Sequence, residues 1–302
     1  MSPLQATVLG GTGYLGSMIV GALVSKGWRV RVGARNAERN AGELAAVSGV
    51  HCDVRDEASL ERAFEGSAAV VNAVGLYRER PGESFDAVHV AGAAHAARAA
   101  ARCGVRRLVH VSGIGASRAS PSSYVRARAE GEDAVRDVLP SAVVVRPSVL
   151  FGPGDAFLGA IDAVSRHSPV FPLFGRGETR MQPVYVGDVA AAVAALVDDP
   201  GAPPTTFELG GKRVLTYREI VGAVLAWRRR RRVLLPVPFG VWMLQAKLTA
   251  WLPSPPLDVH QVILMLSDNV VGDGVAGLAQ LGIAAGDLES LLPVALGARP
   301  AG

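Results

Sequence analysis

The sequence predicts an α/β protein in which a doubly wound parallel sheet is followed by a smaller C-terminal lobe. Three observations predict this class. The chain has 302 residues, of which 49% are hydrophobic, so it can bury a large core and is not intrinsically disordered. Short apolar runs with little polar alternation recur through its first half, as they do in strands buried on both faces. Segments of helical length separate several of these runs and predict right-handed crossover connections.

The expected strands lie in residues 1–150, which form the first predicted domain. They are the apolar runs at residues 7–9, 29–32, 69–74, 108–111 and 142–145. Helices between parallel strands cover both faces of a sheet, so this half of the chain is expected to be doubly wound.

The second half of the chain has a different pattern. Glycine and proline interrupt residues 152–183, and proline breaks the Leu-rich tail into short pieces. A helix is expected at residues 187–197, a strand at 206–209, and a further helix that Thr216 caps. We therefore expect residues 151–302 to form a smaller lobe that completes a ligand cleft.

Charge and cysteine content exclude several classes of protein. The chain has 31 basic and 27 acidic residues, and its net charge of +4 depends on five adjacent arginines at residues 228–232. A chain-wide nucleic-acid surface is therefore not expected. Cys52 and Cys103 are too few for a disulfide framework and fit a reducing compartment. No secretory signal and no apolar run of membrane-spanning length is visible, so we expect a cytoplasmic protein, soluble or peripheral to a membrane.

A glycine-rich turn follows the first predicted strand and opens an apolar helix. Its glycines recur every third residue, which allows a tight turn, a close approach to a pyrophosphate, and packing of the helix on the strand. The N-terminus of that helix would favour the phosphates. The turn predicts a Rossmann-type nucleotide-binding domain; the alternative is a turn that binds nothing. The expected cofactor-binding residues are Gly10, Thr12, Gly13, Tyr14, Leu15 and Gly16.

The residues after the second and third strands bear on which dinucleotide binds. Arg35 stands where an acidic residue would accept a ribose 2′-hydroxyl. An arginine can pair with a 2′-phosphate instead, which favours NADP(H) and leaves NAD(H) as the alternative. A solvated arginine at a strand end is the other interpretation. Asp53, followed by Val54, is placed to accept from an adenine amino group, although aspartate also commonly caps turns.

These motifs resemble those of the extended and atypical short-chain dehydrogenases/reductases, over nearly the whole chain. Within that superfamily the chain is most similar to the nucleotide-binding accessory subunit of respiratory complex I and its bacterial relatives. The resemblance rests on Gly10-x-x-Gly13-x-x-Gly16, Asp53-Val54, Asn72-Ala73-Val74-Gly75, Val111-Ser112, Tyr124, Arg146-Pro147-Ser148, and the segments 107–115, 129–132, 145–154, 182–190 and 207–211.

The resemblance implies a bound NADP(H) or NAD(H) and two competing functions. Proteins similar to the complex I subunit hold the nucleotide structurally near the quinone-reducing region. We therefore expect an accessory or assembly subunit of NADH:quinone oxidoreductase with little or no turnover. The alternative is an NADP(H)-dependent reductase or epimerase of a small carbonyl or quinone-related substrate, as in other branches. A redox-sensing regulator that binds nucleotide without chemistry is a third interpretation.

The family also implies a catalytic set, and this chain departs from it. The family uses Tyr-x-x-x-Lys on a helix, with the tyrosine as general acid or base and the lysine to lower its pKa and to bind the nicotinamide ribose, so both positions are also expected to bind the cofactor. Here the pair is Tyr124 and Arg128, whose spacing puts both side chains on one helical face. Arginine keeps the charge but cannot reproduce the hydrogen bonds of an ammonium group. Whether this chain is an enzyme therefore stays open.

Other positions of the site follow from the same resemblance. Ser112 would orient a carbonyl oxygen beside Tyr124, with a turn cap as the alternative. The backbone of four residues would run alongside the adenine-proximal ribose, namely Asn72, Ala73, Val74 and Gly75. The nicotinamide would be lined by Pro147 and Val149. The six histidines show no paired metal spacing, so no metal site is expected.

Residues 228–252 are the expected partner- or membrane-facing segment. Five arginines precede an apolar stretch that contains Trp242, Leu244, Leu248 and Trp251. Such a stretch can lie on a membrane surface or on subunits of the respiratory complex. The alternative is a solvated loop followed by an ordinary core helix.

Overall fold

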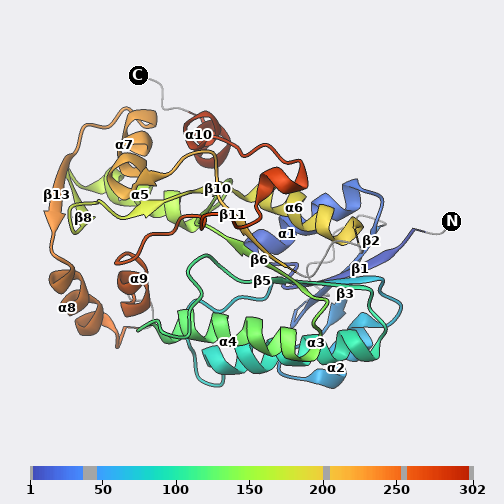
Figure 1. The fold of residues 1–302 in the computed structure, drawn as a ribbon. Coiled ribbons are helices and arrows are strands. Elements are labelled where there is room, and N and C mark those ends of the chain that lie inside the picture. Colours follow the sequence, from blue (N-terminus) through green and yellow to red (C-terminus); the bar gives the residue numbers. More distant parts are fainter. Residues whose placement is uncertain (1–2, 37–45, 200–204, 253–256, 299–302) are drawn as a thin grey trace. The chain divides into compact units, whose positions relative to one another are not determined.

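The computed structural model describes residues 3–36, 46–199, 205–252 and 257–298 (Figure 1). These residues form two compact units, each built from separate stretches of the chain. The first unit comprises Met1–Pro147, Val186–Leu209 and Gly272–Ala284. The second comprises Ser148–Tyr185, Gly210–Val271 and Ala285–Gly302. The chain therefore enters each unit three times, which differs from a single boundary near residue 150.

A seven-stranded parallel sheet forms the centre of the first unit, in the order β11-β6-β5-β4-β1-β2-β3. The predicted fold class is confirmed, since this is the doubly wound Rossmann-type arrangement. The returning segment supplies the edge strand β11, which pairs with β6, and this pairing explains why residues 186–209 belong to the first unit. The strands are β1 Gln5–Leu9, β2 Arg29–Ala34, β3 Val47–His51, β4 Ala69–Asn72, β5 Arg107–Val111, β6 Val143–Pro147 and β11 Thr206–Leu209.

Helices cover both faces of this sheet (Figure 1). α1 and α6 pack together on one face, and α2, α3 and α4 pack in succession on the other. The helical elements are α1 Tyr14–Ser25, α2 Glu57–Phe64, the π-helix η2 Asp86–Ala91, α3 Gly92–Arg102, α4 Ser123–Val138, α6 Val186–Asp198 and the 3₁₀ helix η3 Leu278–Leu281.

Small residues let α4 approach its neighbours closely. A Cβ atom on Gly131 would lie 2.0 Å from the carbonyl oxygen of His89, so no larger residue fits there. Alanines of α3, among them Ala93, Ala96 and Ala97, are fully buried in the same core. This close packing determines where α4 holds Tyr124 and Arg128.

The second unit consists of helices and three short two-stranded sheets. Thr216 caps α7 in a capping box with Glu219, as the sequence predicts for a capping threonine. The elements are β7 Leu150–Phe151, α5 Ala156–His167, β8 Val170–Phe174, β9 Arg180–Met181, β10 Val184–Tyr185, β12 Leu215–Thr216, α7 Tyr217–Trp227, β13 Val233–Val237, α8 Phe239–Thr249, α9 Val259–Leu264 and α10 Leu288–Leu296.

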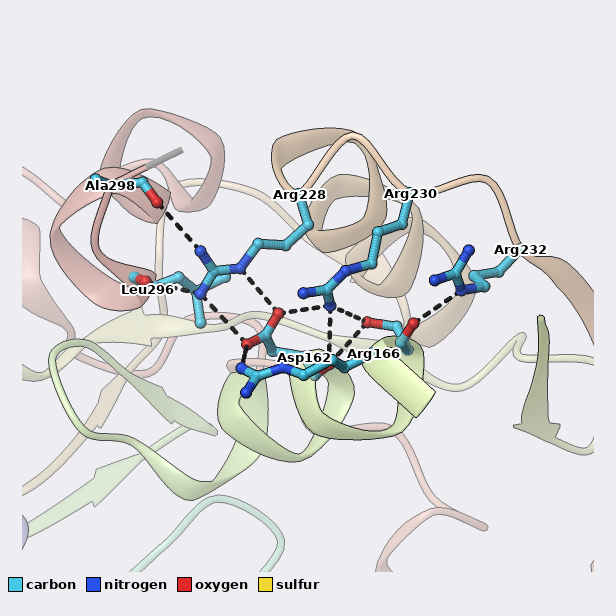
Figure 2. Close-up of polar contacts among 8 residues, drawn as sticks. Asp162, Arg166, Arg228, Arg230, Arg232, Leu296 and Ala298 are labelled. Carbon is cyan, nitrogen blue, oxygen red and sulfur yellow. Dashed lines mark hydrogen bonds and ion pairs between the residues drawn. The ribbon is translucent and has the colours of Figure 1, made fainter. Parts of the chain in front are cut away.

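Three of the five arginines at residues 228–232 form hydrogen bonds within the second unit (Figure 2). Arg228 Nε and Arg230 Nη1 each donate to Oδ1 of Asp162 at 2.8 Å. Arg232 Nε donates to the backbone oxygen of Ser165 at 2.8 Å. The expectation of a solvated arginine loop is wrong for these three residues, because Asp162 and Ser165 of α5 provide acceptors for their guanidinium groups.

The helix that follows the run is mostly exposed. Within α8 only Ala246 is buried, while Trp242 donates to the backbone oxygen of Leu173 at 3.1 Å and packs on Phe174. An ordinary core helix, the alternative expectation, is therefore wrong for α8. In the described parts of the chain, no helix combines the length and apolarity that crossing a bilayer requires.

Candidate functional site

The glycine-rich turn between β1 and α1 permits two close backbone contacts. Gly10 has a φ of +71°, and a Cβ atom there would lie 2.9 Å from the backbone oxygen of Ala73. A Cβ atom on Gly16 would lie 2.1 Å from the backbone oxygen of Gly10. Side chains at these positions would push the turn apart, so the structure requires glycine at both.

The N-terminus of α1 opens at this turn. Gly13 is its N-cap and offers no side-chain acceptor, and the first turn holds no acidic residue. The positive end of the helix dipole is thus not neutralised by a carboxylate in the first turn of the helix, and this favours an anionic ligand there. Thr12 and Gly13 are exposed on the turn, while Tyr14 and Leu15 are half-buried.

Four charged side chains gather where β2 and β3 end. Arg35 forms an ion pair with Glu83 of the loop after β4. Asp53 accepts from Arg55 Nε at 2.9 Å, and this contact with Arg55 keeps the pKa of the Asp53 carboxyl below its usual value. Sequence reasoning missed Arg55 and Glu83. Arg55 stands two residues after Asp53 and could have been suspected, whereas no local pattern marks Glu83.

The end of β4 lies beside the glycine-rich turn. Asn72 is buried, its Oδ1 accepts from Val74 N at 3.3 Å, and its Nδ2 lies 3.2 Å from His110 Nδ1. Ala73 N donates to Leu9 O at 3.1 Å. Burial lowers the pKa of His110 to about 4, so this imidazole is neutral at physiological pH. Val54, the residue after Asp53, packs against the start of α3. A Cβ atom on Gly92 would lie 2.8 Å from Cγ2 of Val54.

Tyr124 and Arg128 meet on one face of α4, as their spacing predicts. Arg128 Nε donates to Tyr124 Oη at 2.8 Å, and the guanidinium carbon lies 5.0 Å from the tyrosine ring centroid. Cβ atoms on Gly75 and Gly113 would lie 3.9 Å and 3.5 Å from Arg128 nitrogens. The guanidinium therefore sits between the carboxyl ends of β4 and β5, where glycines leave it room.

Aromatic side chains enclose Tyr124. Its ring centroid lies 5.5 Å from that of Phe85, 5.7 Å from His89 and 5.8 Å from Tyr77, and the residue is 7% exposed. Burial raises the Tyr124 pKa to about 12, although Arg128 acts in the opposite direction. The phenol thus keeps its proton at neutral pH and can donate it, but it is a poor base. The sequence did not indicate any of these three aromatic neighbours.

Ser112 directly follows β5, and its side-chain hydroxyl is buried. Its Oγ makes no hydrogen bond with any residue that the structure describes, while its backbone N donates to Val145 O at 2.7 Å. The side chain does not cap a turn, so that alternative is wrong. Buried polar atoms of proteins are nearly always paired, and a hydroxyl left over at the end of a central strand is suited to a ligand.

Pro147 and Val149, expected beside the nicotinamide, belong to different units. Pro147 ends β6, and its backbone oxygen accepts from Ile114 N at 3.1 Å. In the second unit, Val149 N donates to Asn269 Oδ1 at 3.0 Å.

The first unit fits a dinucleotide on three counts. The glycines leave a cradle that Cβ atoms would fill, the helix N-terminus above it lacks its own carboxylate, and Ser112 Oγ is unpaired among the described residues. The described residues contain no group of three or more His, Cys, Asp or Glu side chains that could hold a metal ion.

Comparison with known proteins agrees with this geometry. A model of the NAD dependent epimerase/dehydratase family matches residues 6–210, which include the sheet and the whole glycine-rich turn. The chain belongs to this family. The family and the cradle together support a nicotinamide dinucleotide as the cofactor.

Relatives of this epimerase/dehydratase family member include both a respiratory subunit and an enzyme. This chain is 36% identical to NADH dehydrogenase (ubiquinone) 1 alpha subcomplex subunit 9 of Arabidopsis thaliana mitochondria. The match extends over 290 residues, which are 90% of this chain and 72% of the relative. The chain is 32% identical over 250 residues, 81% of its length and 77% of the relative's, to a ceramide reductase of Caulobacter vibrioides. The resemblance to the complex I accessory subunit is confirmed.

The fold is shared with solved structures. Triphenylmethane reductase of Citrobacter sp., complexed with NADP(H), superposes with a TM-score of 0.76 at 18% identity, covering 97% of this chain and all of that one. At this identity the likeness concerns the fold alone. Within this family, therefore, the residues that separate binding from turnover must be judged from the site itself.

Proposed function

We propose that this protein holds NAD(P)(H) as an accessory or assembly subunit of an NADH:quinone oxidoreductase, with little or no turnover. The hydrogen bond from Arg128 Nε to Tyr124 Oη carries the proposal. The sequence similarity to the mitochondrial complex I subunit supports the choice of partner.

The contact between Arg128 and Tyr124 weakens the tyrosine as a catalyst. An oxygen that accepts from a guanidinium while its ring is enclosed by aromatic side chains has few directions left from which to meet a substrate. Burial has also moved the Tyr124 pKa to about 12, away from the range of an efficient acid or base. The same arginine keeps a positive charge near the expected nicotinamide ribose, so binding of the nucleotide is retained.

We propose NADP(H) as the preferred cofactor. Arg35 and Arg55 stand at the ends of β2 and β3, and two guanidinium groups suit a phosphate dianion better than a hydroxyl. NAD(H) remains the alternative, because both arginines have carboxylate partners in this structure.

The proposal places the protein in the cytoplasm, peripheral to the inner membrane, with residues 228–252 toward a partner subunit or the bilayer. Arg229 and Arg231 are exposed, and no acidic residue occurs in this segment. A basic and apolar surface of this kind suits a membrane-bound complex with anionic lipid around it. Exposed apolar side chains of the segment are Val233, Leu235, Val241, Leu244, Leu248 and Trp251, the last 79% exposed.

Purification of the native protein tests this function. The protein is isolated in mild detergent, co-purifying subunits are identified by mass spectrometry, and the nucleotide is released by denaturation and assigned by chromatography. We expect NADP(H) near one equivalent together with subunits of NADH:quinone oxidoreductase. Isolation of a nucleotide-free protein, or of a lone protein with rapid turnover, would overturn the proposal.

The unpaired Ser112 hydroxyl favours a second candidate, an NADP(H)-dependent reductase or epimerase of a small carbonyl or quinone-related substrate. The similarity to a ceramide reductase supports it. Bound cofactor would supply the hydride, Tyr124 Oη would give its proton to the carbonyl oxygen, and Ser112 Oγ would donate a hydrogen bond to that oxygen.

Substitution of the phenol separates the two candidates. For the reductase, Tyr124→Phe abolishes carbonyl or quinone reduction and leaves nucleotide affinity nearly unchanged. Ser112→Ala is the companion variant, for which a smaller loss is expected. If a panel of carbonyl, quinone and sugar-nucleotide substrates shows no Tyr124-dependent turnover, the reductase is excluded.

A further inference from the structure

The loop after β4 forms a tight turn at residues 80–83. Arg80 N donates to Glu83 O at 3.0 Å, and Glu83 N donates to Arg80 O at 2.8 Å. Gly82 has a φ of +78°, which glycine adopts without strain. The two hydrogen bonds give this turn a defined shape, so it presents the Glu83 carboxylate in a definite direction.

Two arginines that follow strands of the sheet form polar contacts with this turn. Arg35, after β2, pairs with the Glu83 carboxylate, and Arg55, after β3, donates from Nη1 to Gly82 O at 2.6 Å. Arg55 also pairs with Asp53 through Nε. The two cations that could receive a 2′-phosphate are thus already matched by two carboxylates of the same unit.

We infer that Glu83 occupies the place of the cofactor's 2′-phosphate, and that NADP(H) binds by displacing this carboxylate from Arg35. The inference rests on the proposed function, since it presupposes a dinucleotide in the glycine-rich turn. Glu83 is then a specificity-determining residue: NAD(H), which lacks the phosphate, leaves the turn closed, whereas NADP(H) opens it.

The strengths of the two contacts make the exchange feasible. The Arg35 side chain is 56% exposed, so its side of the pair is open to water, which weakens ion pairs. A phosphate carries more charge than a carboxylate and pairs with guanidinium groups bidentately. Removing the competing carboxylate should therefore raise NADP⁺ affinity by only about two- to fivefold, the value of an exposed pair.

Titration of purified full-length protein with NADP⁺ and with NAD⁺ by calorimetry tests the exchange. We expect Glu83→Gln to bind NADP⁺ more tightly and NAD⁺ with unchanged affinity. In the Arg35→Gln background the same substitution should have no effect on NADP⁺. Glu178→Gln is the matched control, because it removes the same charge from another exposed arginine–glutamate pair, with Arg176 in the second unit.

Several outcomes overturn the inference. Unchanged NADP⁺ affinity in Glu83→Gln does so, and so does an equal gain in Glu178→Gln. A loss of NAD⁺ affinity in Glu83→Gln would instead identify Glu83 as the acceptor of the ribose 2′-hydroxyl. If the wild-type protein binds neither dinucleotide, the proposed function fails together with the inference; if it binds and only the substitution has no effect, the inference alone fails.

Hydrogen exchange gives a second readout that needs no variant. The amide hydrogens of Arg80 and Glu83 are both bonded within the turn. We expect NADP⁺ to speed their exchange in the wild-type protein and NAD⁺ to leave it unchanged. Equal protection with the two nucleotides would contradict the displacement.

Discussion

Asp162 is the carboxylate on which the arginine cluster of the second unit converges (Figure 2). Its Oδ1 accepts from Arg228 Nε and Arg230 Nη1 at 2.8 Å each, and its Oδ2 accepts from Arg166 Nη2 at 3.0 Å. Burial opposes ionisation of this carboxyl, but the arginines outweigh it and lower its pKa. We predict that Asp162→Asn destabilises the second unit strongly, because three guanidinium groups then face one another without an anion.

The expected loss follows from the burial of the partners. The side chains of Arg228 and Arg230 are 13% and 17% exposed, so this is a buried network rather than a surface pair. Removing one partner of a buried pair lowers the free energy of unfolding by about 3–5 kcal/mol. Because asparagine keeps one acceptor oxygen, we expect about 3 kcal/mol for Asp162→Asn and about 4 kcal/mol for Asp162→Ala.

Urea unfolding followed by tryptophan fluorescence measures this loss. Urea is uncharged and does not screen the network. Of the four tryptophans, Trp227, Trp242 and Trp251 lie in the second unit, so the signal reports mainly on it. The control is Glu178→Gln, whose ion pair is 76–79% exposed and should contribute little. A loss below about 1 kcal/mol in Asp162→Asn, or an equal loss in the control, would refute the reasoning.

Three further predictions concern the glycine-rich turn, Arg229 of the arginine run, and the dependence of stability on pH. Gly16→Ala should weaken nucleotide binding at least about tenfold by calorimetry, because its Cβ would lie 2.1 Å from a backbone oxygen, whereas Gly21→Ala on the same helix meets open space and should bind normally. Arg229→Gly should raise the free energy of unfolding by about 1 kcal/mol in urea, because Arg229 has a φ of +53° at the C-terminus of α7; a decrease would mean that its side chain makes a stabilising contact. His89 and His110 have pKa values lowered to about 3 and about 4, so stability is complete above pH 6.5 and falls as the pH drops toward 4, by up to about 1.4 kcal/mol per pH unit for each; equal urea midpoints at pH 7 and pH 5 would contradict this.

Much of the fold could be predicted because its signals are local. Strands buried on both faces appear as apolar runs, and the glycines at 10, 13 and 16 mark a turn whose backbone contacts exclude side chains. The boundary near residue 150 did not include the return of residues 186–209, because the pairing of β11 with β6 joins positions about sixty residues apart and leaves no local trace.

The candidate site was predictable in part for the same reason. Tyr124 and Arg128 share a helical turn, so their spacing alone brings them together. Glu83, Tyr77 and Phe85 come from a loop whose path depends on tertiary packing, and no periodicity places them beside Arg35 or Tyr124. The unpaired state of Ser112 Oγ likewise depends on every neighbour around it.

The amino-acid sequence by itself determined the class of this protein: a parallel sheet, a dinucleotide turn at its N-terminal end, and an arginine where the family has a lysine. Helical periods, strand burial and glycine spacing act over a few residues, so a linear reading captures them. Only the tertiary structure decided how the charges are used. It turned three arginines of the 228–232 run onto Asp162 and Ser165, and it set Glu83 against Arg35. Whether a charge is solvated or paired depends on which groups the fold brings within a few ångströms of it. Local sequence patterns do not give the distance between charged side chains that are far apart along the chain.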